Sequence, residues 1–283
     1  MKPNFNKRPF IRVTDISKGC FSGWDSIFEA LEARLKENDH PKKIVKVECY
    51  QGVYFDDLLN IFCSYLKPRR IITSKDYFLP PEEVERITFP DVTDDRIFGY
   101  LTRLNMTDLV DREKVSELKK EVEEAGDGLI LIFGYGASFI SDQSSILIYA
   151  DMPRWEIQLR MRANKVDNLG MENKNDSIEE KYKRGFFVDW RICDRLKKQL
   201  MHRWDFILDS TKMEEPILLT AESYRKGLEK TLSQPFSLMP YFDQGPWGGQ
   251  WMKKVCDLDP EPENYAWCFN CVPEENSLLL KYG

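Results

Sequence analysis

The chain has 283 residues, 42% hydrophobic and 13% aromatic, which is enough to build one large or two ordinary packed domains and excludes a disordered chain. Its net charge of −6, with no long basic run and no apolar segment of membrane-spanning length, argues against nucleic-acid and membrane partners. Seven irregularly spaced cysteines and an N-terminus without an apolar signal segment predict a reduced, cytoplasmic setting.

Short apolar strands alternate with amphipathic helices along residues 43–209, and this pattern predicts an α/β fold with a mostly parallel sheet and flanking helices. A helix at 24–35 is expected to precede the sheet. Strands are predicted at 43–49, 70–73, 128–133, 146–150 and 205–208. Helices are predicted at 55–65 and 112–124, where apolar residues recur at helical spacing.

The composition changes twice after these elements. Residues 164–183 are polar and predict a loop or lid, and residues 182–191 mix aromatic with basic side chains, which indicates a packed interface. A domain boundary is expected within 214–234. We therefore predict a first domain at 1–225 and a short β-rich second domain at 226–283, which begins with a helix at 226–232.

Candidate binding residues follow the predicted strands. Gly52 lies in the turn after the first core strand, and Asp76 follows the second within Ser-Lys-Asp-Tyr-Phe-Leu-Pro. Arg154, Arg160 and Arg162 follow the fourth. This order of strands and motifs resembles the uridine-kinase and pantothenate-kinase branch of the P-loop kinases. The resemblance implies that Asp76 is a catalytic base, and that Gly52 and the three arginines bind phosphate.

The phosphate loop departs from that family. A working loop, Gly-x-x-x-x-Gly-Lys-[Ser/Thr], surrounds phosphates with backbone amides, a lysine and a magnesium-binding hydroxyl. Residues 48–57 read Glu-Cys-Tyr-Gln-Gly-Val-Tyr-Phe-Asp-Asp, with one glycine, three acidic residues and no lysine. A helix N-terminus favours an anion by only about 0.3–1 kcal/mol. We therefore expect a degenerate kinase fold that binds no nucleotide. Alternative interpretations are a turn-capping Asp76 and arginines on a solvated helix face.

Residues 240–252 read Pro-Tyr-Phe-Asp-Gln-Gly-Pro-Trp-Gly-Gly-Gln-Trp-Met. This segment resembles the N-terminal signature of class I mannose-6-phosphate isomerases, which are zinc cupins. The positions that carry the resemblance are Pro240, Phe242, Trp247, Gly248 and Gly249, with Trp267 in the block that follows. The resemblance implies that the chain contains the beginning of a cupin domain, and that the complete protein interconverts mannose 6-phosphate and fructose 6-phosphate.

The metal ligands of that family lie beyond this segment, whereas the two histidines of the chain, His40 and His202, precede it. Zinc catalysis requires about three or four converging ligands. We therefore expect zinc in the complete isomerase, but no metal site, no cofactor and no isomerase activity in this chain.

These expectations assign the chain to sugar-phosphate metabolism, with a sugar phosphate as its ligand. An incomplete cupin exposes strand edges, so a second copy or a complementing cupin half is the expected protein partner. Two alternatives stay open. One is an atypical P-loop kinase for a small molecule, and the other is a non-catalytic module that binds a nucleotide or a sugar phosphate.

Overall fold

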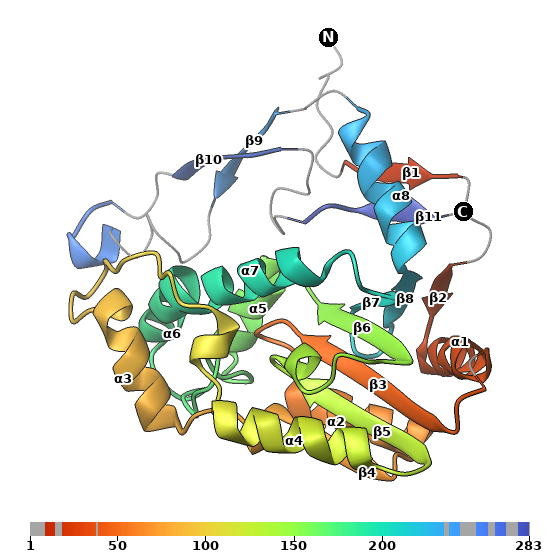
Figure 1. The fold of residues 1–283 in the computed structure, drawn as a ribbon. Helices are drawn as coiled ribbons and strands as arrows, with labels where there is room; N and C mark the ends of the chain where they lie inside the picture. The colour runs from red at the N-terminus through yellow and green to blue at the C-terminus, as the bar shows by residue number, and fades with distance from the viewer. Residues whose placement is uncertain are drawn as a thin grey trace. The chain divides into compact units, whose positions relative to one another are not determined.

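The computed structural model describes residues 9–14, 19–37, 39–234, 238–243, 253–259, 264–269 and 277–282. The chain forms two compact units (Figure 1). The larger, here called the sheet unit, comprises Gly19–Met152 and Glu156–Glu222. The smaller, called the terminal unit, comprises Met1–Lys18, Pro153–Trp155 and Ser223–Gly283.

A mixed sheet forms the centre of the sheet unit. Its strands are β2 (Cys20–Ser22), β3 (Lys42–Cys49), β4 (Arg70–Thr73), β5 (Gly128–Gly134), β6 (Ile146–Asp151), β7 (Phe206–Asp209) and β8 (Ile217–Thr220). They lie in the order β2-β8-β7-β6-β3-β5-β4. Strands β4, β5, β3, β6 and β7 run parallel, while β8 and β2 continue the sheet by antiparallel pairing. The predicted α/β class is confirmed, and the antiparallel edge makes the sheet mixed.

Helices flank this sheet (Figure 1). They are α1 (Trp24–Lys36), α2 (Phe55–Leu66), α3 (Pro81–Val92), α4 (Arg112–Glu124), α5 (Arg154–Arg162), α6 (Ile178–Arg184) and α7 (Trp190–Leu200). Short helical turns lie between them at η1 (Ser74–Asp76), η2 (Met106–Asp108), η3 (Ala137–Phe139) and η4 (Gly185–Asp189), the last of which is π-helical. The helices predicted at 24–35, 55–65 and 112–124 are confirmed, whereas α3, α6 and α7 were not predicted.

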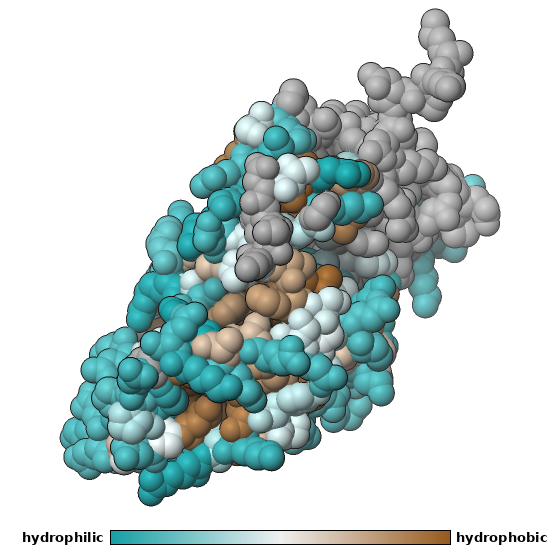
Figure 2. All heavy atoms as spheres, turned by 90° about the vertical axis from the view of Figure 1, so that its right-hand side faces the viewer, coloured by the Kyte–Doolittle hydropathy of each residue, from teal (hydrophilic) through white to brown (hydrophobic). Residues whose placement is uncertain are grey.

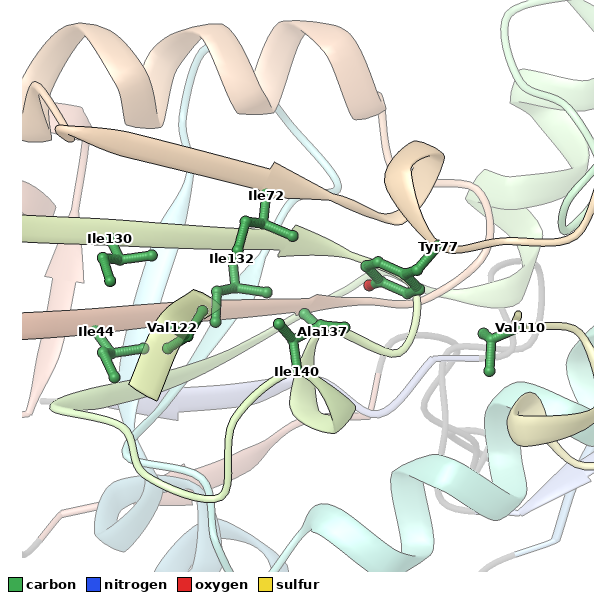
Figure 3. Close-up of a cluster of buried hydrophobic side chains, with 9 residues drawn as sticks. All are labelled: Ile44, Ile72, Tyr77, Val110, Val122, Ile130, Ile132, Ala137 and Ile140. Carbon is green, nitrogen blue, oxygen red and sulfur yellow. The ribbon is translucent and has the colours of Figure 1, made fainter. Parts of the chain in front are cut away.

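Alternating side chains of the central strands build a core on each face of the sheet. Figure 3 shows the cluster under α4, which comprises Ile44, Ile72, Tyr77, Val110, Val122, Ile130, Ile132, Ala137 and Ile140. On the opposite face, the ring of Phe133 lies 5.0 Å from that of Phe55 and 6.2 Å from that of Phe62, both on α2. Helices therefore bury both faces, which explains why β5 is apolar along its whole length.

Local signals set the ends of several helices. The carboxylate of Asp111 caps α4 by accepting hydrogen bonds from the amides of Glu113 (3.0 Å) and Lys114 (3.2 Å). Pro81 occupies the first turn of α3, where its missing N–H costs nothing. Lys67 ends α2 in the left-handed conformation, with φ of 46°.

The terminal unit contains two strand pairs and most of α8 (Ala221–Leu232). β1 (Ile11–Val13) pairs in parallel with β11 (Leu280–Tyr282), and the hydroxyl of Tyr282 donates to the carbonyl of Ser223 at 3.0 Å. β9 (Leu238–Asp243) pairs antiparallel with β10 (Asn264–Phe269), which sets Pro240 opposite Trp267. Phe242 also lies in β9. The remaining residues of the predicted isomerase motif, Trp247, Gly248 and Gly249, lie outside the described residues.

Figure 2 shows one side of the molecule, where hydrophilic residues form most of the coloured surface and hydrophobic ones gather between them. Across the ranges that the structure describes, no helix has both the length and the apolar character to span a membrane.

Replacing Ile132 by alanine tests the core under α4. Ile132 is 0% exposed, so we expect Ile132→Ala to lower the free energy of unfolding by about 2–5 kcal/mol. The matched control is Leu101→Ala, because Leu101 is 58% exposed and its loss changes stability by about 0.5 kcal/mol or less. Equilibrium unfolding in urea measures both variants. Equal small effects would contradict the burial described here.

Candidate functional site

A pocket of about 860 Å³ opens at the carboxyl ends of β3, β4 and β5. Four segments contribute to its lining: residues 53–57 after β3, residues 74–75 and 78–81 after β4, Tyr135 after β5, and parts of the loop at 165–175, with Lys114 of α4 beside them. Open α/β sheets bind their ligands at this end of the strands. The volume falls in the range of roughly 300–1,000 Å³ that small-molecule sites occupy.

The lining of the pocket combines three kinds of side chain. The aromatic residues are Tyr54, Phe55, Phe78 and Tyr135. The lysines are Lys75, Lys114, Lys165 and Lys174, and the carboxylates are Asp56, Asp57, Asp167 and Glu172. The lining therefore contains four cations and four anions. One pair is in contact, since Lys75 Nζ lies 3.0 Å from Asp56 Oδ1. The lining thus combines aromatic side chains with equal numbers of lysines and carboxylates.

Gly52 shapes the turn after β3. Its φ of +102° lies in a region that favours glycine, and an added Cβ would lie 2.8 Å from Cγ2 of Ile157. Its carbonyl accepts a hydrogen bond from Nη1 of Arg160 at 2.9 Å. The structure therefore brings together two of the predicted phosphate ligands, Gly52 and Arg160, although neither lines the pocket.

Arg160 is 1% exposed and acts as an internal brace. Its guanidinium stacks on the ring of Tyr54 at 4.0 Å. Nε donates to Glu156 Oε1 at 2.8 Å, and Nη2 donates to the carbonyl of Ser210 at 2.7 Å. These contacts join the turn after β3 to the segment after β7, so they position Tyr54 in the pocket wall.

Arg154 and Arg162 begin and end α5. Both are partly buried, and neither lines the pocket. Arg154 belongs to the terminal unit, whereas Arg162 belongs to the sheet unit. The three arginines of the predicted lid therefore do not converge on the pocket, and their role in phosphate binding stays a prediction.

Asp76 stabilises the turn after β4. Its Oδ2 accepts hydrogen bonds from the amide of Thr73 at 2.7 Å and from the hydroxyl of Thr73 at 3.1 Å. This is the turn-capping alternative that the sequence left open. Asp76 does not line the pocket, but its neighbours Ser74 and Lys75 do. A catalytic role for Asp76 stays a prediction.

Glu48 is a buried acid at the end of β3 that sequence reasoning counted only as unfavourable charge near the phosphate loop. It is fully buried, and its carboxylate accepts hydrogen bonds from the amides of Gly136 (2.6 Å) and Ser138 (2.9 Å). Burial raises the pKa of Glu48 to about 7, although both amides lower it in part. Two residues earlier, buried Lys46 donates to the carbonyl of Ser141 at 2.8 Å, and burial lowers its pKa to about 8.

Residues 164–183 are predicted as a loop or lid, and the structure forms a loop at 165–175 but a helix, α6, from Ile178, so the last part of that prediction is wrong. Buried Lys181 of α6 ties this loop to the sheet unit. Its ammonium donates to the carbonyl of Met161 (2.7 Å), to Asn164 Oδ1 (2.7 Å) and to the carbonyl of Lys174 (2.5 Å). An ammonium has three donors, so all of them are used. Lys181 therefore holds both ends of the loop.

A second set of buried groups holds the middle of this loop. Nδ2 of Asn168 donates to Asp189 Oδ2 at 2.6 Å, and Nε2 of Gln51 donates to the carbonyl of Asp167 at 2.8 Å. Burial raises the pKa of Asp189, while the charge of Arg184 opposes this shift. The loop is thus a braced wall of the pocket. The sequence pattern of polar residues cannot predict these contacts, because they join segments far apart in the sequence.

Comparison with known proteins assigns most of the sheet unit to a family. The family model described as Domain of unknown function (DUF8485) matches residues 23–233. The chain belongs to this family. The DUF8485 region contains every segment that lines the pocket. No curated protein matches the sequence.

Replacing Lys181 by methionine tests the brace on the loop. Lys181→Met leaves three acceptors without their donor, of which the carbonyl of Met161 is in a buried bond and the other two in part-buried bonds, so we expect a loss of about 1–3 kcal/mol in the free energy of unfolding. We also expect faster tryptic cleavage at Lys165 and Lys174. Urea unfolding and mass spectrometry of the digest measure the two effects, with the exposed Lys120→Met as the control. Unchanged stability together with unchanged cleavage would show that the loop does not depend on Lys181.

Proposed function

We propose that this chain is a non-catalytic module that binds a sugar phosphate in the pocket at the carboxyl ends of β3, β4 and β5. The lining of the pocket carries the proposal. Carboxylates accept hydrogen bonds from sugar hydroxyls, lysines donate to a phosphate, and the apolar face of a sugar ring packs on aromatic side chains. A lining with equal numbers of cations and anions suits a ligand with one phosphate better than a nucleoside triphosphate.

The sheet supports a relationship to P-loop kinases. Numbered along the chain, its five parallel strands lie in the order second, third, first, fourth, fifth, so the first strand is central and the turn after it faces the pocket. The chemistry of that turn argues against phosphoryl transfer, because Phe55, Asp56 and Asp57 begin α2 where a kinase has lysine and a hydroxyl residue. We therefore propose a kinase-like scaffold that binds its ligand without transferring phosphate.

The terminal unit supports the second part of the proposal, that β9 and β10 begin an isomerase-like cupin. Pro240 and Trp267, two residues of the motif, are paired across these strands. A two-stranded pair is at best marginally stable alone, so we propose that a second copy or a complementing cupin half adds strands to it. In the complete protein, zinc would support aldose–ketose isomerisation. Within the described ranges no three His, Cys, Asp or Glu side chains are grouped to hold a metal, so no step of that reaction is assigned to them.

Ligand-dependent stability tests the binding proposal. Mannose 6-phosphate or fructose 6-phosphate at 100 times its dissociation constant is expected to raise the free energy of unfolding by about 2.7 kcal/mol, with no such effect from mannose or magnesium–ATP. Lys165→Ala, in the pocket wall, is expected to weaken binding about tenfold, a loss of about 1.4 kcal/mol.

The control for this experiment is Lys120→Ala, which removes an exposed lysine of α4 outside the pocket and is expected to leave affinity unchanged. Thermal unfolding and calorimetric titration provide the readouts. Stabilisation by magnesium–ATP alone would favour the atypical kinase. Stabilisation by none of these compounds would refute the module proposed here.

The purified chain is also expected to show no interconversion of mannose 6-phosphate and fructose 6-phosphate when zinc is added, since the described residues supply no metal-binding group. A coupled spectrophotometric assay measures this, with a complete class I isomerase as the positive control. Zinc-dependent turnover by the chain would overturn the assignment of catalysis to other parts of the complete protein.

A further inference from the structure

We propose that Glu48 is a positioning residue for the pocket, and that its protonation state controls how firmly the turn carrying Tyr135 is held. The effect on ligand affinity rests on the proposed function, whereas the effect on the turn does not. Glu48 would act on the ligand only through Tyr135.

Glu48 binds the backbone immediately after Tyr135. Glu48 Oε1 accepts a hydrogen bond from the amide of Gly136 at 2.6 Å, and Oε2 accepts one from the amide of Ser138 at 2.9 Å. From another direction, the hydroxyl of Tyr77 donates to the carbonyl of Tyr135 at 2.9 Å. Tyr135 itself lines the pocket. A buried side chain of the central strand therefore fixes the backbone around one residue of the ligand site.

The turn is packed so closely that its position sets those of its neighbours. At Gly134, where φ is +119°, an added Cβ would lie 2.5 Å from Oγ of Ser74 and 2.7 Å from Cε2 of Phe55. The ring of Tyr135 lies 5.9 Å from that of Phe55 and 6.2 Å from that of Phe78. Ser74, Phe55 and Phe78 also line the pocket. Movement of this turn would thus change the apolar wall as a whole.

Glu48 is suited to this control because little charge surrounds it. The titratable groups that act on it or feel its charge are Lys46 and Cys49 on β3, Tyr77 after β4, Tyr149 on β6 and Cys193 on α7. Burial holds the pKa of both cysteines and both tyrosines well above their ordinary values, so these four are neutral. Lys46 supplies the opposing cation. It lowers the pKa of Glu48 less than burial raises it.

The direction of the effect follows from the two environments of Glu48. In the closed turn burial raises its pKa from an ordinary 4.5 to about 7, and in an opened turn, exposed to water, it returns towards 4.5. The closed turn therefore binds the proton more tightly. Its stability is greatest at acid pH and is lost as the pH rises through about 7. With these two values, the opening equilibrium constant rises about tenfold between pH 6 and pH 8.

Amide hydrogen exchange of the full chain tests this directly. After correction for the intrinsic exchange rate, the opening constants at Gly136 and Ser138 are expected to rise about tenfold from pH 6 to pH 8 in the wild type. The same amides are expected to lose this dependence in Glu48→Gln, which keeps the side-chain size but does not titrate. The amide of Ile130 in β5 is the internal control. Opening constants at Gly136 and Ser138 that are independent of pH, or that follow Ile130, would overturn the proposal, even if the variant fails to fold.

Calorimetric titration with mannose 6-phosphate at the same two pH values then tests the effect on the ligand. The ratio of wild-type to Glu48→Gln affinity removes the titration of the phosphate itself, and this ratio is expected to fall as the pH rises. A constant ratio would overturn the control of affinity by Glu48. If the turn opens in a pH-dependent way but mannose 6-phosphate binds at neither pH, the sugar-phosphate proposal is refuted and the positioning of Tyr135 by Glu48 stays supported.

Discussion

The burial of β3 between β5 and β6 is the constraint on which the site depends. A strand enclosed on both faces must satisfy every polar group that it carries, because an unpaired buried charge is costly. Lys46 and Glu48 meet this requirement through backbone groups of the segment that follows β5. Their contacts therefore hold the connection between β5 and β6 in place, and this connection supplies one wall of the pocket. The stability of the strand and the shape of the site share the same hydrogen bonds.

Polar groups of the turn after β3 are also used in contacts within the protein. In a working phosphate loop, by contrast, exposed amides and a lysine are available to bind the ligand. Here Gly52 presents its carbonyl to Arg160, and Gln51 joins the turn to the loop at 165–175. Residues at the position of the phosphate loop therefore bind other parts of the protein, where in a kinase they would bind a nucleotide. The neighbouring pocket has exposed lysines and half-buried aromatic rings, which are the groups that the proposed binding of a small phosphorylated ligand would use.

The sequence predicted elements whose apolar periodicity is strong. The continuous run of β5 and the helical spacing in α4 both located their elements within one or two residues. It failed at α7, because its N-terminal residues were interpreted by their aromatic and basic composition instead of by helical period. The site was the harder case. Asp76 and Arg160 have the right residue types for catalysis and phosphate binding, yet Asp76 caps its own turn and Arg160 joins the turn after β3 to the segment after β7. Glu48 gave no signal, since its partners lie about 90 residues away and only the fold brings them together.

The pairing of β1 with β11 has a consequence for biosynthesis. These strands come from opposite ends of the chain, with Ile11 beside Leu280. β1 is synthesised before β11 and has no partner in this pair until β11 has left the ribosome, whereas the strands of the larger sheet, β2 to β8, complete their pairings earlier. Pairing β1 with β11 also closes a long loop, and the entropy cost of closing it makes this contact form late in folding. Until β11 is made, β1 is therefore an unpaired strand whose two apolar residues, Ile11 and Val13, are buried only in the folded protein.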